Sequence, residues 1–403
     1  MLIITNISEI VGIVSEGVLR KEGAAMAETG VLKDAWIAIE DGRIKGFGLM
    51  GTEPEEAEVI DAEGGMVLPA FCDSHTHIVY AGSRDGEFLD KINGLSYEEI
   101  AARGGGILNS SDLLHQTSED ELFEQSMARV HEMMAKGTGT LEIKSGYGLN
   151  PEDELKMLRV IRRIKESVPA LVKSTFLGAH AIGRGYSHEA YVQAVVDMMP
   201  KASELADFVD VFCDEGFFTV EDTDRILTAG AACGLRPKIH ANELAVSGGV
   251  QVGVRHDALS VDHLERTTEV EIEVLRGSST MPTMLPGSSF FLGIPFGRAK
   301  EFIGAGLGVA LASDYNPGSS PSGDMRFVMA LGCIRMRLTP VQALNAVTLN
   351  SAYAMGVSDI TGSITPGKRA DLILTHPGWT LTKLPYLYQT PFIRKVFLGG
   401  QAI

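Results

Sequence analysis

The segment Met66-Val-Leu-Pro-Ala-Phe-Cys-Asp-Ser-His-Thr-His77 decides the fold, because it joins an apolar run to two histidines one residue apart. The run from Met66 to Cys72 has the length and composition of a buried strand. Side chains on a strand alternate with a period of two, so His75 and His77 are expected to point to the same side. Two neutral imidazoles placed in this way can bind one divalent metal ion. A His-x-His pair is weak evidence by itself and needs support from the rest of the chain.

Seven further short runs rich in Val, Ile and Leu follow this segment, and helical stretches separate them. They lie at residues 138–143, 171–179, 208–213, 236–239, 258–262, 279–284 and 308–313. Strands that alternate with helices are typical of a parallel sheet covered by helices. Eight strands with crossover helices predict a (β/α)8 barrel of the TIM type. An open, doubly wound sheet is the alternative interpretation of the same pattern.

Both ends of the chain have β character instead. Asp41-Gly42 lies between two apolar runs and predicts a hairpin, and residues 370–375 and 392–398 read as strands. With 403 residues, the chain exceeds what one hydrophobic core usually supports. The predicted organisation is therefore a hydrolase barrel at 66–362, flanked by 1–65 and 363–403. We expect these two flanking parts to pair into one small β-sandwich.

Composition narrows the classes of partner. The formal net charge of −17 argues against nucleic acid or an anionic membrane surface, because both require clustered Lys and Arg. An anionic small molecule remains an allowed substrate, since it senses only local charge. The four cysteines are scattered, which indicates reduced thiols, and the chain shows neither a basic leader nor an apolar stretch of membrane-spanning length. We expect a cytoplasmic protein that acts on a small molecule.

In a (β/α)8 barrel the active site lies at the carboxyl ends of the strands. Chemically active side chains follow seven of the eight runs, and five of the ten histidines in the chain are among them. In chain order, these side chains are His75 and His77, Lys144 to Tyr147, His180, Asp214 and Glu215, His240 and Glu243, His263, and Asp314. A barrel would bring all of them to one rim.

Three histidines and one carboxylate are a ligand set suited to zinc or iron. A metal ion in such a site lowers the pKa of a bound water toward neutrality. Glu243, three residues after His240, is placed to take a proton from water and pass it to a leaving nitrogen. His263 is placed to orient the water or to stabilise an oxyanion. Each of these residues also has a purely structural interpretation: His180 as a core histidine, Glu243 as a residue at the start of a helix, and Asp314 as a turn residue. The prediction of a functional site therefore depends on their shared location at the strand ends.

Several longer segments resemble the amidohydrolase superfamily, and most closely its imidazolonepropionase family. The most specific are Glu142-Ile-Lys-Ser-Gly-Tyr-Gly148 and Asp314-Tyr-Asn-Pro-Gly318, whereas His-x-His marks only the superfamily. The similarity spans nearly the whole chain and also includes residues 73–77, 82–84, 94–100, 104–107, 176–180, 240–243 and 262–264.

The resemblance implies hydrolysis of 4-imidazolone-5-propanoate to N-formimino-L-glutamate in histidine degradation, by a protein that is a homodimer. It implies one Zn²⁺ or Fe³⁺ per chain, held by His75, His77, His240 and Asp314, with Glu243, His263 and Asp314 as the catalytic residues. The implied substrate-binding residues are Arg84, Tyr147, His180, Glu243, Asn316, Gly318 and Ser319. One departure from the family's commonest pattern is Asn242, where an aspartate is frequent. Binuclear members carry a carboxylated lysine after the fourth strand, and Cys213-Asp214-Glu215 here favours a single metal ion.

The residues also suit the chemistry of that substrate. Its propionate needs a cation, and Arg84, the only nearby cation that the sequence offers, can bind a carboxylate through two parallel hydrogen bonds. Tyr147 can add a hydroxyl. Two alternatives remain. One is a mononuclear deaminase of purines or pyrimidines, and Arg84 and Tyr147 argue against it because a neutral base needs no carboxylate-binding pair. The other is a non-catalytic scaffold, which would be expected to have lost at least one metal ligand or the proton shuttle. Gly104 to Gly106 match no phosphate-binding spacing and predict a flexible loop.

Overall fold

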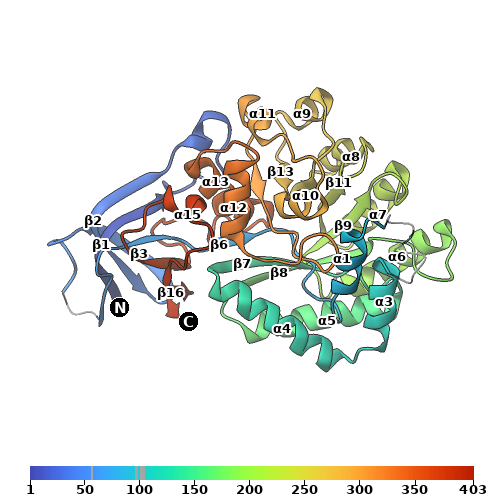
Figure 1. Ribbon diagram of the computed structural model, residues 1–403, viewed down its shortest axis with the longest axis horizontal. Helices are drawn as coiled ribbons and strands as arrows, with labels where there is room; N and C mark the ends of the chain where they lie inside the picture. The colour runs from blue at the N-terminus through green and yellow to red at the C-terminus, as the bar shows by residue number, and fades with distance from the viewer. Residues whose placement is uncertain (56–57, 96–98, 100–104) are drawn as a thin grey trace.

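Parallel strands around a ring form the larger part of the molecule (Figure 1). The computed structural model describes residues 1–55, 58–95, 99 and 105–403. The strands of the ring are β6 (Phe71–Asp73), β7 (Thr138–Lys144), β8 (Leu171–Ala179), β9 (Phe208–Cys213), β10 (Arg236–Pro237), β11 (Ile239–Ala241), β12 (Ser260–His263), β13 (Met281–Met284) and β14 (Ala310–Leu311). They pair in the order β14-β13-β12-β11-β9-β8-β7-β6, and β10 also pairs with β9.

The ring closes between its first and last strands at their carboxyl ends. Thr76 and Tyr315 form a parallel bridge. The backbone N–H of Asp314 donates to His75 O at 3.0 Å, and that of His77 donates to Tyr315 O at 2.9 Å. The structure therefore confirms the predicted (β/α)8 barrel over the open sheet. The closing hydrogen bonds fall on the segments that carry three of the four predicted metal ligands.

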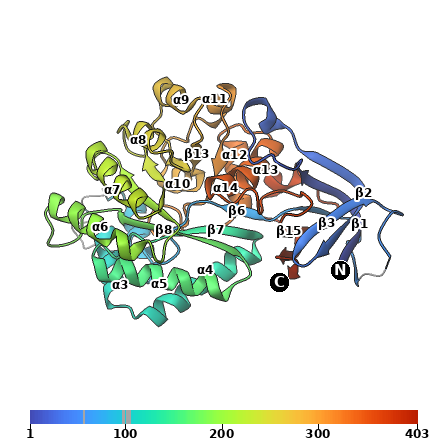
Figure 2. The same cartoon turned by 180° about the vertical axis from the view of Figure 1, so that it is seen from behind.

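Helices surround the strands of the barrel (Figures 1 and 2). They are α1 (Asp85–Ile92), α3 (Ile107–Gln116), α4 (Glu119–Ala135), α5 (Pro151–Ser167), α6 (His188–Ala202), α7 (Val220–Ala232), α8 (Gly249–Arg255), α9 (Glu269–Leu275), α10 (Pro286–Leu292), α11 (Ala299–Gly304), α12 (Met325–Ile334), α13 (Pro340–Val347) and α14 (Leu349–Ala354). Helix α5 shows why they begin where they do: the Asn150 side chain accepts the N–H of Asp153, and Pro151 opens the first turn. Its apolar face buries Leu158, Ile161 and Ile164 against the barrel.

The two ends of the chain pair with each other, as the sequence predicts, and in the described part of the chain their strands form a second sheet of eight strands. Its strands are β1 (Leu2–Ile13), β2 (Gly30–Glu40), β3 (Arg43–Leu49), β4 (Glu58–Asp61), β5 (Gly65–Pro69), β15 (Leu372–Pro377), β16 (Ile393–Leu398) and β17 (Gln401–Ala402). They pair in the order β17-β16-β15-β5-β1-β2-β3, with β4 also beside β1. Asp41 and Gly42 form the hairpin turn between β2 and β3, where Glu40 pairs with Arg43. Both termini lie in this part of the molecule (Figure 1), which also holds η1 (Gly23–Ala27) and α15 (Lys383–Tyr386) at its junction with the barrel.

The apolar run 66–72, predicted to be one barrel strand, is divided between the two sheets. Residues up to Pro69 belong to β5, which pairs with β1 and with β15. After Ala70 the chain enters β6, which pairs with β7 in the barrel. Both halves are fully buried and equally apolar, so composition gives no sign of the change. Proline has no N–H to donate to a ladder, which suits Pro69 to the end of β5.

The described residues contain no helix long and apolar enough to cross a membrane. All four cysteines are free thiols, two of them buried, in agreement with their scattered positions in the sequence.

Candidate metal centre and active site

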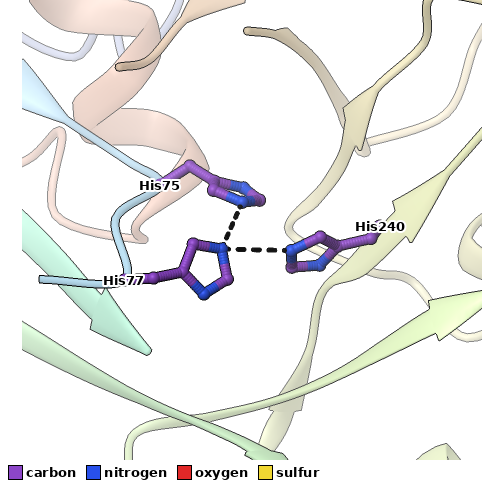
Figure 3. A group of neighbouring side chains, drawn as sticks. All are labelled: His75, His77 and His240. Carbon is purple, nitrogen blue, oxygen red and sulfur yellow. Dashed lines mark hydrogen bonds between the residues drawn. The ribbon is translucent and has the colours of Figure 1, made fainter. Parts of the chain in front are cut away.

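Three imidazoles converge at the carboxyl ends of β6 and β11 (Figure 3). The Nε2 atoms of His75 and His77 lie 3.1 Å apart, and that of His240 lies 3.4 Å from that of His77. Asp314, which follows β14, brings Oδ1 to 3.6 Å from His75 Nε2 and 3.5 Å from His77 Nε2. All four side chains are buried. The structure thus brings together the four residues that the sequence suggested as metal ligands.

Two buried carboxylates fix which ring nitrogens face this centre. His75 Nδ1 donates to Asp262 Oδ2 at 2.6 Å, and His240 Nδ1 lies 2.9 Å from Asp210 Oδ2. A ring nitrogen this close to a carboxylate carries the proton, so Nε2 of both histidines presents a lone pair toward His77. Burial lowers the pKa of His75 and of His77, and lowers that of His240 to about 3. These neutral imidazoles with converging lone pairs fit a zinc or iron ion.

The donor set favours one ion rather than two. Two groups of possible ligands overlap: one is His75, His77 and His240, and the other is His75, His263 and Asp314. His75 belongs to both groups, but its Nδ1 is engaged by Asp262, so only Nε2 can bind a metal ion. One shared nitrogen is suited to a single centre.

A buried charge cluster lies beneath the histidines, and the sequence reasoning, which named Lys144 only as a strand-end residue, did not predict it. Lys144 Nζ contacts Glu142 Oε1 at 2.6 Å and Asp210 Oδ2 at 2.8 Å, and lies 3.8 Å from Asp262 Oδ2. Lys238 contacts Glu142 and also lies 3.8 Å from Asp262 Oδ2. Burial alone would lower the pKa of Lys144, but Asp210 and Glu142 together raise it. The signal in the sequence was the presence of charged residues inside otherwise apolar strand runs.

Glu243 and His263 face each other beside the metal centre. Their nearest atoms, Glu243 Oε2 and His263 Nε2, lie 3.6 Å apart, and His263 Nδ1 lies 3.5 Å from Glu265 Oε2. Burial raises the pKa of Glu243 to about 7, a value suited to an acid–base group. Burial would lower the pKa of His263, but Glu243 and Glu265 outweigh it and raise the pKa well above the usual value. The pair therefore combines a carboxyl that titrates near neutrality with a charged imidazole.

Asp214, at the end of β9, holds the loop that carries Glu243. Its Oδ2 accepts the N–H of Glu243 at 2.8 Å and that of Leu244 at 2.9 Å, and its Oδ1 accepts that of Ala245 at 3.1 Å. The carboxylate after the fourth strand thus serves to position a loop.

The backbone at the strand ends is strained. Asn242, His263, Leu264 and Asp314 have φ angles of 60°, 85°, 67° and 55°, in the left-handed region that residues other than glycine rarely adopt. Such residues cluster at functional sites, where the surrounding structure holds them in place. All four lie in or directly beside the predicted metal and catalytic set: His263 and Asp314 belong to it, and Asn242 and Leu264 are the chain neighbours of Glu243 and His263.

Tyr147 and His180 form one wall beside His77. The His180 ring stacks on His77 with centroids 5.2 Å apart, and the Tyr147 ring lies 6.2 Å from His77. His180 Nδ1 lies 2.9 Å from Gly146 O. Buried Glu154 accepts the backbone N–H groups on both sides of Tyr147 and so holds the loop that carries it. Burial raises the pKa of Tyr147, so its phenol stays protonated and can donate a hydrogen bond.

Asn316 is engaged inside its own loop. Its Nδ2 donates to Asp314 O and to Ser319 Oγ, both at 2.7 Å, and its Oδ1 accepts the N–H groups of Gly318 and Ser319, both at 2.8 Å. Ser319 Oγ lies 3.3 Å from Asp314 Oδ2. In this structure Asn316 shapes the loop around Asp314, while Ser319 lies next to the metal centre.

Arg84 lies on the same side of the barrel as this loop, at the start of α1. Its Nε and Nη2 donate to Glu87 Oε2 at 2.9 and 2.6 Å, while Oε1 of Glu87 accepts the N–H of Gly106 at 2.9 Å. The guanidinium packs against Gly318, where an added Cβ would collide with Nη1. A recess of about 280 Å³ opens here, lined by Tyr80, Arg84, Glu87, Phe88, Lys91 and Gly318 among others. Gly104, which belonged to the predicted loop, and most of 96–104 lie outside the described residues.

Comparison with known proteins agrees with this geometry. The sequence model of the amidohydrolase family matches residues 66–403. The chain therefore belongs to the amidohydrolase family.

Relatives with named activities narrow the similarity. The chain is 51% identical over 408 residues to an imidazolonepropionase of Flavobacterium johnsoniae, covering 100% of this chain and 99% of the relative. It is 50% identical over 409 residues to an imidazolonepropionase of Christiangramia forsetii, covering 100% of both chains.

Among solved structures, an adenosine deaminase from Xanthomonas campestris with bound zinc superposes with a TM-score of 0.71 at 16% identity, covering 100% of this chain and 92% of that one. At this identity the likeness concerns the fold alone.

Proposed function

We propose that this protein hydrolyses the ring amide of 4-imidazolone-5-propanoate to give N-formimino-L-glutamate in histidine degradation. The observation that carries the proposal is the joint presence of a converging metal-ligand cluster and a half-buried arginine at a nearby recess. The full-length similarity to imidazolonepropionases supports it. A nucleobase deaminase would not need such a cation.

The metal site is proposed to consist of His75, His77, His240 and Asp314, with one zinc or iron ion per chain. When bound, that ion would polarise the ring carbonyl and lower the pKa of a water molecule at the site. Asp262 and Asp210 keep two of the imidazoles in the tautomer that such an ion requires.

Glu243 is the proposed proton shuttle. In the first step, its carboxylate takes a proton from the attacking water as the water oxygen bonds to the carbonyl carbon. In the second step, it gives that proton to the ring nitrogen as the C–N bond breaks, so the former carbonyl becomes a carboxylic acid, which then releases its remaining proton to solvent as a carboxylate. His263, charged through its two carboxylate neighbours, is placed to donate a hydrogen bond to the oxygen that gains negative charge.

The substrate is proposed to lie between the metal centre and the recess at α1. Tyr147 and His180 would contact the ring, the loop with Asn316, Gly318 and Ser319 would contact the substrate beside Asp314, and Arg84 would bind the propionate. The Arg84 edge formed by Nε and Nη2 is already held by Glu87, which leaves Nη1 for the ligand.

The decisive experiment incubates metal-loaded protein with imidazolone propionate. We expect loss of the substrate's ultraviolet absorbance, appearance of formiminoglutamate and no release of ammonia, with about one metal ion per chain by elemental analysis. Arg84→Met should raise KM about tenfold to a hundredfold, because a hydrogen bond to a charged group is lost, and Arg84→Lys should recover only part. Ammonia release from guanine or cytosine, or an unchanged kcat/KM in Arg84→Met, would overturn the proposal.

A homodimer in the cytoplasm, without nucleic acid or membrane partners, completes the proposal. Its support is the resemblance and the acidic composition, with a net charge of −17. Light scattering coupled to size exclusion would give the oligomeric state directly.

A further inference from the structure

A second cation, Lys91 of α1, lines the recess that holds Arg84. Its Nζ donates to Gly318 O at 3.0 Å, and the Arg84 guanidinium packs against the same glycine. Two positively charged groups thus converge on Gly318. The sequence suggested Arg84 as the only nearby cation, and the structure corrects this. Arg84 and Lys91 are seven residues apart in the sequence, so they come to the same side only when α1 forms.

Two like charges held near each other in a half-buried recess carry an electrostatic cost. Burial lowers the pKa of Lys91, Arg84 lowers it further, and Glu87 opposes both. Glu87 can offset only one of the two charges, and its oxygens already accept hydrogen bonds from Arg84 and Gly106. Asp85, the other acidic residue among the described residues that line the recess, lies exposed at the rim and accepts a hydrogen bond from Ser83. The half-buried groups therefore suit a ligand with one negative charge.

Apolar groups shape the recess around this charge. Phe88 stacks on Phe291 with centroids 5.6 Å apart, and Lys91 Nζ lies 5.4 Å from the Phe291 ring centroid. Aromatic walls shield the ammonium from part of the solvent, which strengthens its attraction to an anion. One of the three ammonium donors is used by Gly318 O, so two remain for a ligand.

We propose that Lys91 is a second carboxylate-binding residue, which binds the propionate of the substrate together with Arg84. This inference rests on the proposed function and adds a specificity-determining residue to it. Arg84 contributes its Nη1 donors, which the contact with Glu87 does not use, and Lys91 contributes a point charge to the same carboxylate. The amide carbonyl of Gly318 keeps the ammonium in place when the ligand is absent.

The test compares two ligands that share an imidazole ring and differ in the carboxylate: 3-(imidazol-4-yl)propanoate and neutral 4-propylimidazole. Their dissociation constants are measured by calorimetry on the metal-loaded protein, in wild type, Lys91→Met, Lys91→Arg and Arg84→Met. The matched control is Lys201→Met, at an exposed lysine on α6. KM and kcat for imidazolone propionate are measured on the same preparations.

We expect Lys91→Met to weaken the carboxylate ligand about tenfold and to leave the neutral ligand within about twofold. KM should rise by a similar factor with kcat nearly unchanged, and Lys91→Arg should retain most of the affinity. Equal weakening of both ligands would mean that Lys91 only supports the Gly318 loop. Unchanged binding of both ligands would mean that Lys91 does not contribute to ligand recognition. Either result overturns the inference. If wild type does not turn over imidazolone propionate, the proposed function fails, while the difference between the two ligands still decides whether Lys91 binds a carboxylate.

Discussion

The two ends of the candidate site hold their functional groups in opposite ways. At the metal end, His75, Asp262, Lys144 and Glu142 have side chains with no exposed surface, and each contacts an ionisable partner from a different segment of the barrel. At the α1 end, Arg84 and its partner Glu87 keep 13% and 12% of their side chains exposed and belong to one helical turn. One end is built on the barrel, and the other on a short helix at its rim.

The difference follows from what each end has to do. A metal site requires imidazoles fixed in tautomer and direction, and strands crossed by buried carboxylates supply that rigidity. The α1 end, in contrast, has to let a ligand enter and leave, and a partly exposed helix at the rim can tolerate the side-chain movements that this requires. Both ends use a carboxylate to hold a functional group. Replacing that carboxylate should therefore reduce function much more at the metal end than at the α1 end.

The largest effect is expected for Glu243→Gln at the metal end. The amide keeps the shape of the side chain but cannot carry the proton, so kcat should fall by about two to four orders of magnitude with metal content unchanged. Because burial raises the pKa of Glu243 to about 7 and the carboxylate is the active form, wild-type kcat/KM should fall as the pH drops below about 7. The residual activity of Glu243→Gln should lack this acidic limb. A loss of less than about tenfold would assign the proton transfer to another group.

The sequence was sufficient for the barrel because its strong alternation of strands and helices is a local signal. It failed at 66–72, where β5 and β6 belong to different sheets although both are apolar and buried. Which sheet a strand joins depends on pairing with distant residues such as those of β15. No local pattern encodes that choice.

Within the site, the residues that follow strands were predictable, since a barrel gathers its strand ends on one rim. His75, His77, His240 and Asp314 were placed on the rim in this way, the resemblance singled them out as metal ligands, and the structure brings them together. Lys238 was not identified, and Lys144 was identified only as a strand-end residue and not as part of a buried ion-pair cluster, because a lysine in a single sequence is expected at the surface. Their burial becomes intelligible only when three carboxylates from neighbouring strands are seen around them.

Asp210→Asn tests the rigid end through a carboxylate that does not itself bind the metal ion. The change removes the charge that keeps the His240 Nδ1 proton in place, so metal affinity should fall about tenfold to a hundredfold. Competition with a fluorescent zinc chelator gives this affinity without reference to activity. His240→Ala, which removes the ligand itself, sets the upper limit of the loss. Unchanged affinity in Asp210→Asn would show that the barrel fixes His240 without its carboxylate partner.

Glu87→Gln makes the same carboxyl-to-amide change at the α1 end, and the smallest effect is expected there. The amide oxygen can still accept from Arg84, but its NH₂ group then faces the Gly106 N–H, and the charge that orients the guanidinium is lost. Because the Arg84–Glu87 pair retains some contact with solvent and joins residues of one helical turn, KM for the carboxylate substrate should rise only about two- to fivefold, which corresponds to about 1 kcal/mol or less. Metal affinity and kcat should not change, since among the described residues no hydrogen bond or ion pair joins Glu87 to the four metal ligands. If the fold rise in KM caused by Glu87→Gln were as large as the fold loss of metal affinity caused by Asp210→Asn, the α1 end would be as rigid as the metal end. The contrast between a strand-built and a helix-built half of the site would then be wrong.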